Sequence, residues 1–176
     1  PVVSGIVALL LQKYKDEVLG PQGVLDIHNN PPWNSTLKAI LIHTAEDMVD
    51  LEGANPTEAS AEFGAAGFPN RGAVFGPGPD FATGYGMVNA QKAAEYMDPS
   101  RFLQASIGPG LTRSYGMTVA KGRKNLRVTL AWDDPPFQGI NDESGAYTRK
   151  LVNNLDLRLV SPSGKVFLPW VLDHSR

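Results

Sequence analysis

The first fourteen residues place the strongest constraint on how this chain can fold. Seven of the ten residues from 2 to 11 are Val, Ile or Leu, and the other three are Ser4, Gly5 and Ala8. A helix of this composition has no polar face to leave in water, so we expect residues 1–14 to form a helix buried in something large. Pro1 suits its first turn, where a missing N–H costs nothing.

The chain of 176 residues has room for one ordinary domain or two small ones. Such a chain can hardly wrap an all-round apolar helix and also build a second domain, which points to further residues before Pro1. The sequence opens without an initiator Met or a signal peptide and stops at Arg176 without a polar tail. We therefore interpret both ends as truncations.

The composition is that of a folded protein: 42% of the residues are apolar, 19% are charged and the net charge is -2. No run of Lys and Arg stands out, so nucleic acid is not an expected partner. Every apolar run is shorter than the ~20 residues of a membrane span, and no span is expected. The chain has no Cys, which excludes disulfides, thiol catalysis and Cys-type zinc sites.

Two further helices are predicted in the first hundred residues. Residues 35–45 have helical spacing, with Asn34 or Ser35 as N-cap. The predicted inward face of this helix consists of Leu37, Ile40, Leu41 and Ala45. A last helix starts at Asn89 as N-cap and runs through Met97, up to the Asp-Pro pair that follows.

Residues beyond about 106 alternate apolar and polar with period two, as β-strands do. The predicted strands cover residues 112–120, 126–132, 155–160 and 165–171, with turn signals such as Ser161-Pro162-Ser163-Gly164 between them. We place the boundary between two domains near residues 98–110.

Three stretches of the first hundred residues resemble the subtilisin-like serine peptidases. In that family a Gly-Thr-Ser-Met-Ala-x-Pro run carries the catalytic serine and leads into a Val-x-Gly-x-x-Ala-Leu-Leu helix, which residues 1–10 (PVVSGIVALL) match from the proline onward. Residues 35–45 (STLKAILIHTA) resemble the next helix of the family. Residues 84–90 (GYGMVNA) resemble the glycine turn before its last catalytic-domain helix. The order and spacing of the three matches make them specific together.

The second half resembles the jelly-roll domain that follows the catalytic domain in one branch of these enzymes, a relative of the P domain of proprotein convertases. The matching residues are 127–136 (RVTLAWDDPP) and 151–164 (LVNNLDLRLVSPSG), whereas residues 46–80 match poorly.

For a jelly roll we expect the strands at 126–132 and 155–160 to pair with each other. The strand at 165–171 should lack its partner, which would normally come from beyond Arg176. Such unfinished edges, and the apolar first helix, should make the chain associate with other molecules.

The resemblance implies an α/β fold, the C-terminal portion of a subtilisin-like parallel-sheet domain at residues 1–100, followed by an antiparallel β-sandwich or jelly roll at residues 106–176, both incomplete. It implies a secreted, extracellular serine endopeptidase that hydrolyses protein or peptide substrates through a Ser-His-Asp triad. That triad would lie upstream of Pro1, so this chain holds no catalytic residue and should be inactive by itself. The first helix would direct its free N–H groups and dipole toward the serine and the developing oxyanion.

The best pattern for an ion site lies in the second half. Asp133, Asp134 and Asp156, together with Asn153 and Asn154, offer the carboxylate and amide oxygens that calcium prefers. Accessory domains like the one this half resembles often carry calcium, which favours Ca2+ as the ion. The alternative is that the two adjacent aspartates cap a turn and that Asp156 forms a hydrogen bond across strands.

Other residues with possible chemistry have simpler explanations. Ser4, with His28 or His43 as its base, is not in a Gly-x-Ser-x-Gly elbow and lies inside an apolar helix, so packing explains it better. Asn34-Ser35-Thr36 matches the N-glycosylation pattern, but helix capping explains the same residues.

Two rival functions stay open from the sequence. One is a non-catalytic β-sandwich binding module with a helical lead-in, which clustered exposed aromatic side chains would favour. Trp132, Trp170 and Phe167 are instead predicted to lie in the interior. The other rival is a peptidase-like protein without a functional triad.

Overall fold

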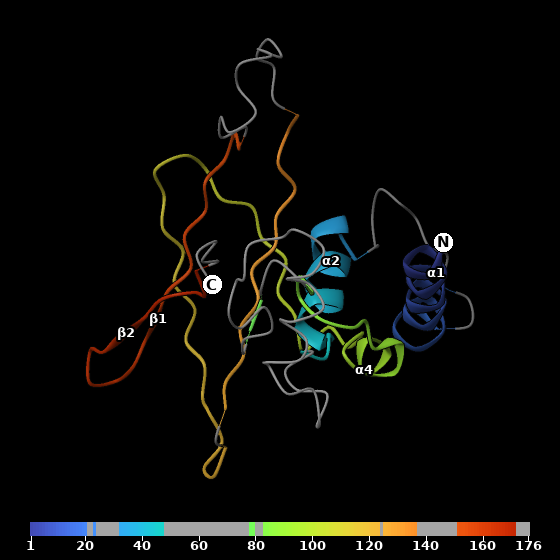
Figure 1. Ribbon diagram of the computed structural model, residues 1–176, viewed down its shortest axis with the longest axis horizontal. Coiled ribbons are helices and arrows are strands. Elements are labelled where there is room, and N and C mark those ends of the chain that lie inside the picture. The colour runs from blue at the N-terminus through green and yellow to red at the C-terminus, as the bar shows by residue number, and fades with distance from the viewer. Residues whose placement is uncertain are drawn as a thin grey trace, which may run out of the picture.

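The computed structural model describes residues 1–20, 23, 32–47, 78–79, 83–123, 125–136 and 151–171. Within these residues the helices are α1 (Val2–Tyr14), α2 (Asn34–Thr44) and α4 (Ala90–Glu95), with a π-helical turn η1 (Lys15–Leu19) after α1. The strands are β1 (Leu159–Val160) and β2 (Val166–Phe167). Figure 1 shows the three helices on one side and the long segments of residues 111–136 and 151–171 on the other, with α2 between α1 and these segments.

The three helices pack around one small apolar core. Its buried residues are Leu10 of α1, Leu37 and Ile40 of α2, Ala93 of α4, and Met97 in the turn after α4. Leu10 is only 1% exposed and is the largest fully buried side chain of the described residues. The inward face predicted for α2 is confirmed, because Leu37, Ile40 and Ala45 are buried and Leu41 packs against the core.

Helix α1 covers this core with one side only. Its predicted helical conformation is confirmed, and Leu10 together with its neighbours on one face contacts the core. Away from this side Val2 and Leu9 are 71% and 63% exposed, and Val3, which lies on the same side as Leu10 but two turns earlier, is 51% exposed. The predicted burial is therefore confirmed for the side that carries Leu10. No described element covers Val2 and Leu9, and the burial of that side stays a prediction.

The start of α2 differs from the predicted one. Its N-cap is Trp33, and neither Asn34 nor Ser35 makes a capping hydrogen bond with its side chain. The amide oxygen Oε1 of Gln104 instead accepts hydrogen bonds from the backbone N–H of Trp33 (2.7 Å) and from the hydroxyl of Thr36 (2.6 Å). A residue about seventy positions later in the chain thus binds one backbone N–H and one hydroxyl at the start of α2.

The start of α4 follows the prediction. Asn89 is the N-cap, and its Oδ1 accepts a hydrogen bond of 2.8 Å from the backbone N–H of Lys92. The predicted glycine turn precedes it, with Gly84 and Gly86 at φ values of 65° and 95°. The helix ends at Glu95, slightly before the predicted end, although Met97 beyond it is still buried.

The strands form one antiparallel hairpin, in which Leu159 is opposite Phe167 and Val160 is opposite Val166. The predicted turn between them is confirmed: Gly164 has φ 82° and its N–H donates to the Ser161 carbonyl at 2.9 Å. The prediction that residues 165–171 lack a partner is wrong for β2. Its partner is β1, because a short local turn suffices to fold the chain back.

No backbone ladder joins residues 126–132 to residues 155–160 within the described part of the chain, so the pairing predicted for them is wrong. Many of their side chains stay exposed, and without a buried face nothing fixes a strand register. Trp170 and Phe167, predicted to be interior, are 69% and 45% exposed. The described residues form neither a parallel sheet nor a sandwich, and those assignments stay predictions. None of the described helices is long and apolar enough to cross a membrane.

Candidate functional site

The end of α2 is the place where most parts of the chain meet, and we call residues 43–47 the junction. Helix α2 leaves its last carbonyl groups unpaired, at the negative end of its dipole. Arg127 lies there, and its Nη1 donates to the backbone carbonyls of His43 (2.7 Å) and Ala45 (3.4 Å). A cation at this end of a helix is favourable, so Arg127 acts as the cap of α2.

His43 packs into the junction with its ring as well as its backbone. Its Nδ1 lies 3.0 Å from the hydroxyl oxygen of Thr129, and its ring centroid is 5.0 Å from that of Tyr96. Burial first, and then the positive charge of Arg127, hold the pKa of His43 below its ordinary value of 6.5. The imidazole is therefore neutral at neutral pH and joins α2 to the extended segment without adding a second cation.

Glu46 connects the junction to the start of α4. Its backbone pairs with that of Met87 through two hydrogen bonds of 2.8 Å, and its carboxylate accepts from Lys92 Nζ (2.7 Å) and Asn89 Nδ2 (2.8 Å). The hydrogen bond from Lys92 and then that from Asn89 lower the pKa of Glu46. Gly86 makes the close approach possible, because a Cβ there would lie 2.1 Å from the Glu46 carbonyl oxygen.

Asp47, the last junction residue, binds a third part of the chain. Its carboxylate accepts a hydrogen bond from the backbone N–H of Gly78. The indole of Trp170 in turn lies against Gly78, where an added Cβ would be 3.0 Å from the ring. Segments near residues 78, 87, 127 and 170 therefore all reach the end of α2, directly or through one residue.

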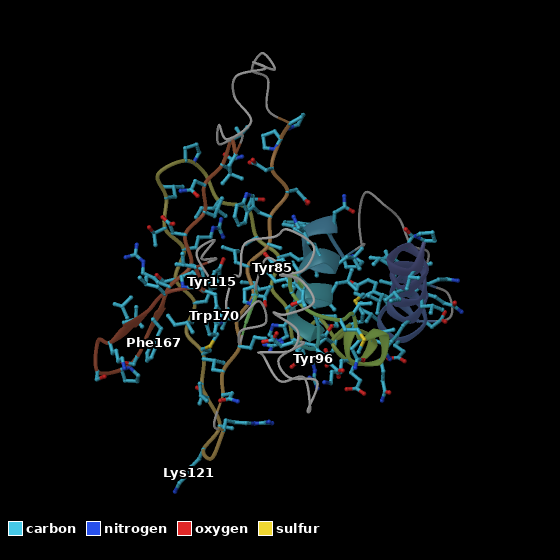
Figure 2. The ribbon with its side chains drawn as sticks, in the orientation of Figure 1. Tyr85, Tyr96, Tyr115, Lys121, Phe167 and Trp170 are labelled. Carbon is cyan, nitrogen blue, oxygen red and sulfur yellow. The ribbon has the colours of Figure 1, made fainter. Side chains whose placement is uncertain are left out.

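The junction borders an open cleft of about 560 Å³. The residues that line it are His43, Thr44, Ala45, Glu46, Asp47, Lys92, Glu95, Tyr96 and Arg127. Figure 2 shows Tyr96 here, beside the end of α2. Thr129 and His43 form a hydroxyl–imidazole pair, but within the described residues no carboxylate is hydrogen-bonded to the ring to orient it. A nucleophile–base pair needs that third group, so the arrangement supports a structural role.

Among the predicted ion-site residues, the structure brings Asp134 and Asn153 together. The Asp134 carboxylate accepts from the backbone N–H of Val152 (2.8 Å) and from both the backbone N–H (2.8 Å) and Nδ2 (2.9 Å) of Asn153. Desolvation raises the pKa of Asp134, but these three donors outweigh it and the net pKa is lowered. The predicted approach of residues 133–134 to residues 153–156 is confirmed for this pair.

The contacts of Asp134 leave little room for a calcium ion. A carboxylate has about four lone-pair sites, and N–H donors occupy three of those of Asp134. Asp133 and Asp156 are exposed and make no side-chain hydrogen bond with the described residues. The described residues contain no group of three or more His, Cys, Asp or Glu that could hold a metal ion. In this arrangement the residues do not fit calcium, and the Ca2+ site stays a prediction.

The remaining candidates are apart from one another. Ser4 lies in α1, His43 lies in the junction, and His28 is outside the described residues. Thr36 of the glycosylation pattern is buried and donates its hydroxyl to Gln104. Sequence reasoning missed Gln104, Arg127 and Thr129, since single polar residues in a strand-like segment carry no signal of a helix-end partner.

Comparison with protein-family models, with curated proteins and with solved structures found no match. Hydrogen bonds and one ion pair among the described residues, Lys92–Glu46, join the extended segments to the end of α2 at the junction.

Proposed function

We propose that this chain is a structural, non-catalytic portion of a secreted subtilisin-like serine endopeptidase. One observation carries the proposal. Two of the stretches that resemble the family, residues 1–10 and 35–45, form α1 and α2, and the third, residues 84–90, is the turn that leads into α4; these three helices share one core although they are far apart in the sequence. A common core is what three elements of one catalytic domain require.

In such an enzyme the chemistry would take place upstream of Pro1. A serine attacks the peptide carbonyl, a histidine takes its proton, and an aspartate orients the histidine. The contribution of this chain would come from the start of α1. The first helical hydrogen bond runs from Gly5 N–H to the Pro1 carbonyl, no side chain caps the start, and the first turn has no acidic residue. The N–H groups before Gly5 are thus free to face negative charge that develops nearby.

The junction would give the chain a second role, that of coupling. Gln104 holds the start of α2 and Arg127 holds its end, so residues beyond 100 are tied to the helical part at two places. The accessory part of the enzyme would then be stabilised together with the rear of the active site, and loss of one would weaken the other.

The decisive experiment reads the coding sequence immediately before Pro1. The proposal expects codons for Gly-Thr-Ser-Met-Ala and one further residue, with His and Asp motifs farther upstream. The encoded protein should then react with a fluorophosphonate probe and lose that reaction when the predicted serine is replaced by alanine. A different sequence before Pro1 would overturn the proposal.

The isolated chain provides the complementary test. Residues 1–176 should neither degrade casein nor react with the fluorophosphonate, because no triad can form from the described residues. Labelling that disappears in Ser4→Ala would contradict this assignment and place the nucleophile within α1.

A second candidate, a non-catalytic binding module, gains support from one observation. Trp170, Tyr115 and Phe167 are 69%, 55% and 45% exposed, and Figure 2 labels these three side chains. Exposed aromatic side chains are typical of binding surfaces. The upstream sequence separates the two candidates, because a binding module needs none of the three triad motifs.

A further inference from the structure

Residues 111–119 form an extended, exposed segment with an apolar side, which we call the stripe. Leu111, Tyr115, Met117 and Val119 are 67%, 55%, 56% and 50% exposed, and Thr, Ser and Gly alternate with them. Alternate residues of an extended chain point to the same side, so these four and Arg113 share one side. Figure 1 shows the stripe within the long yellow segment, and Figure 2 labels Tyr115 on it.

The backbone of the stripe is unpaired within the described part of the chain. The backbone hydrogen bonds nearest to it are turns, from Leu111 N–H to the Gly108 carbonyl and from Arg123 N–H to the Ala120 carbonyl, both 3.2 Å. Residues 112–119 make none to any described residue. A row of free N–H and C=O groups is the template on which an extended peptide can add as a strand.

The charge around the stripe has one sign. Residues 99–132 contain six Lys and Arg and no Asp or Glu, whereas residues 1–98 contain five Lys and Arg and 12 Asp and Glu. Four of these six cations lie within residues 121–127, and the other two are Arg101 and Arg113. The side chains of Arg113, Lys121 and Arg123 make no hydrogen bond or ion pair with any described residue, so their charges are uncommitted.

We propose that the stripe binds an extended polypeptide segment in which apolar and acidic residues alternate. Its backbone would pair with that of residues 112–119, its apolar side chains would cover the exposed apolar side, and its carboxylates would meet Arg113 and the cations of the following turn. The proposal goes beyond the peptidase assignment and does not depend on it, because the segment is bound and not cleaved.

The apolar side chains favour a peptide over a nucleic acid as the partner. Nucleic acids bind to basic surfaces through aromatic side chains that stack on bases. Of the four apolar residues on the stripe, only Tyr115 is aromatic, and the other three are Leu111, Met117 and Val119. Aliphatic side chains with a free strand edge suit a polypeptide.

Fluorescence anisotropy with the chain 1–176 tests the proposal. The probe is a short labelled peptide of alternating valine and glutamate, and its matched control alternates valine and lysine. The acidic peptide should bind about tenfold more tightly at low salt, and added salt should reduce the difference. Equal binding of the two peptides would overturn the proposal.

Two pairs of exposed substitutions locate the site without disturbing the core. Arg113→Glu should weaken binding of the acidic peptide about fivefold. Lys38→Glu makes the same charge change at an exposed position of α2 and should not weaken it. Met117→Ser should weaken it more than Leu9→Ser, which removes an equally exposed apolar side chain of α1. Equal effects within either pair would place the binding elsewhere.

Two further outcomes would replace the proposed partner by another. A labelled single-stranded oligonucleotide that binds more tightly than the acidic peptide would make the surface a nucleic-acid site. Light scattering that shows dimers of the chain, abolished by Arg113→Glu, would make the occupant a second copy. Either result contradicts the peptide proposal.

Discussion

The helical part and the extended part of this chain contain similar apolar side chains and bury them to very different degrees. Leu10 on α1 is 1% exposed, whereas Leu168 after β2 is 77% exposed. A helix satisfies its own backbone, so three short helices close a core as soon as their apolar sides meet. An extended segment first needs a neighbouring strand for its backbone. Among the described residues β1 and β2 form the one ladder, and Glu46 and Met87 add an isolated bridge. Regular backbone pairing thus limits burial here more than hydrophobicity does.

The largest effect is expected from the core. Leu10→Ala should lower the free energy of unfolding by about 2–5 kcal/mol, because it removes a fully buried side chain. Leu168→Ala, the same substitution at an exposed position, should change it by less than about 0.5 kcal/mol. Urea denaturation of both variants measures the difference. Similar losses in both would mean that the extended part is packed as firmly as the helices.

Gly86→Ala should have the next largest effect. Its φ is 95°, and the added Cβ would meet the Glu46 carbonyl oxygen. We therefore expect the free energy of unfolding to fall by about 3 kcal/mol. Gly84→Ala is the matched control, since φ is 65° there and nothing lies near the added Cβ. This variant should lower the free energy of unfolding by about 1 kcal/mol. Thermal denaturation of the two variants separates the close contact from the backbone strain. Equal melting temperatures would show that residues 86–87 do not pair with Glu46.

Arg127→Ala should reduce stability by about 1 kcal/mol, because it removes the cation that caps α2. Arg123→Ala, which removes a side chain without a described partner, should be nearly neutral. Hydrogen exchange gives the sharper test. Amides in the last turn of α2 should exchange faster in Arg127→Ala alone, and unchanged protection there would show that the two parts are not coupled at this point.

The titration of His43 should change the stability of the chain with pH, by less than the Arg127 substitution does. Its pKa is lowered in the folded chain, so below 6.5 the unfolded state binds more protons than the folded state does. The stability that comes from keeping His43 neutral is complete above pH 6.5. It is lost as the pH falls through 6.5 toward the pKa of His43 in the folded chain. His43→Gln should flatten this part of the curve, and an unchanged curve would assign the effect to other groups.

Calcium should produce the smallest effect. Three N–H donors occupy the Asp134 carboxylate, so neither calcium nor a chelator should shift the melting temperature measured by scanning fluorimetry. An ion that binds only the folded chain would raise it by mass action. A rise in the natural chain that is absent in Asp134→Asn would establish the ion site predicted from the sequence.

The sequence predicted those features that depend on residues close together in the chain. The spacing of Leu37 and Ile40, the cap at Asn89 and the turn that ends at Gly164 each act within a few positions, and all are found. The approach of Asp134 to Asn153 spans 19 positions and was predicted through the expected strand pairing, although that pairing itself was wrong.

The long-range contacts of α2 were not predicted. Gln104 and Arg127 act 71 and 84 positions away from their partners. Each is one polar residue that binds a backbone group, and almost any residue offers such a group. Periodicity reports which side of an element is apolar, but it does not report which polar side chain reaches a distant helix end.

The distance in sequence between α2 and its two partners also sets when the contacts at its ends can form during synthesis. At about 5–20 residues per second, Gln104 follows Trp33 off the ribosome by roughly 4–14 s, and Arg127 follows His43 by roughly 4–17 s. The nascent α2 therefore lacks both partners at first. Gln104 becomes available at its start, and Arg127 becomes available at its end later. Synonymous codons that slow translation between residues 45 and 104 would lengthen this interval, during which the growing chain is exposed to proteases and chaperones.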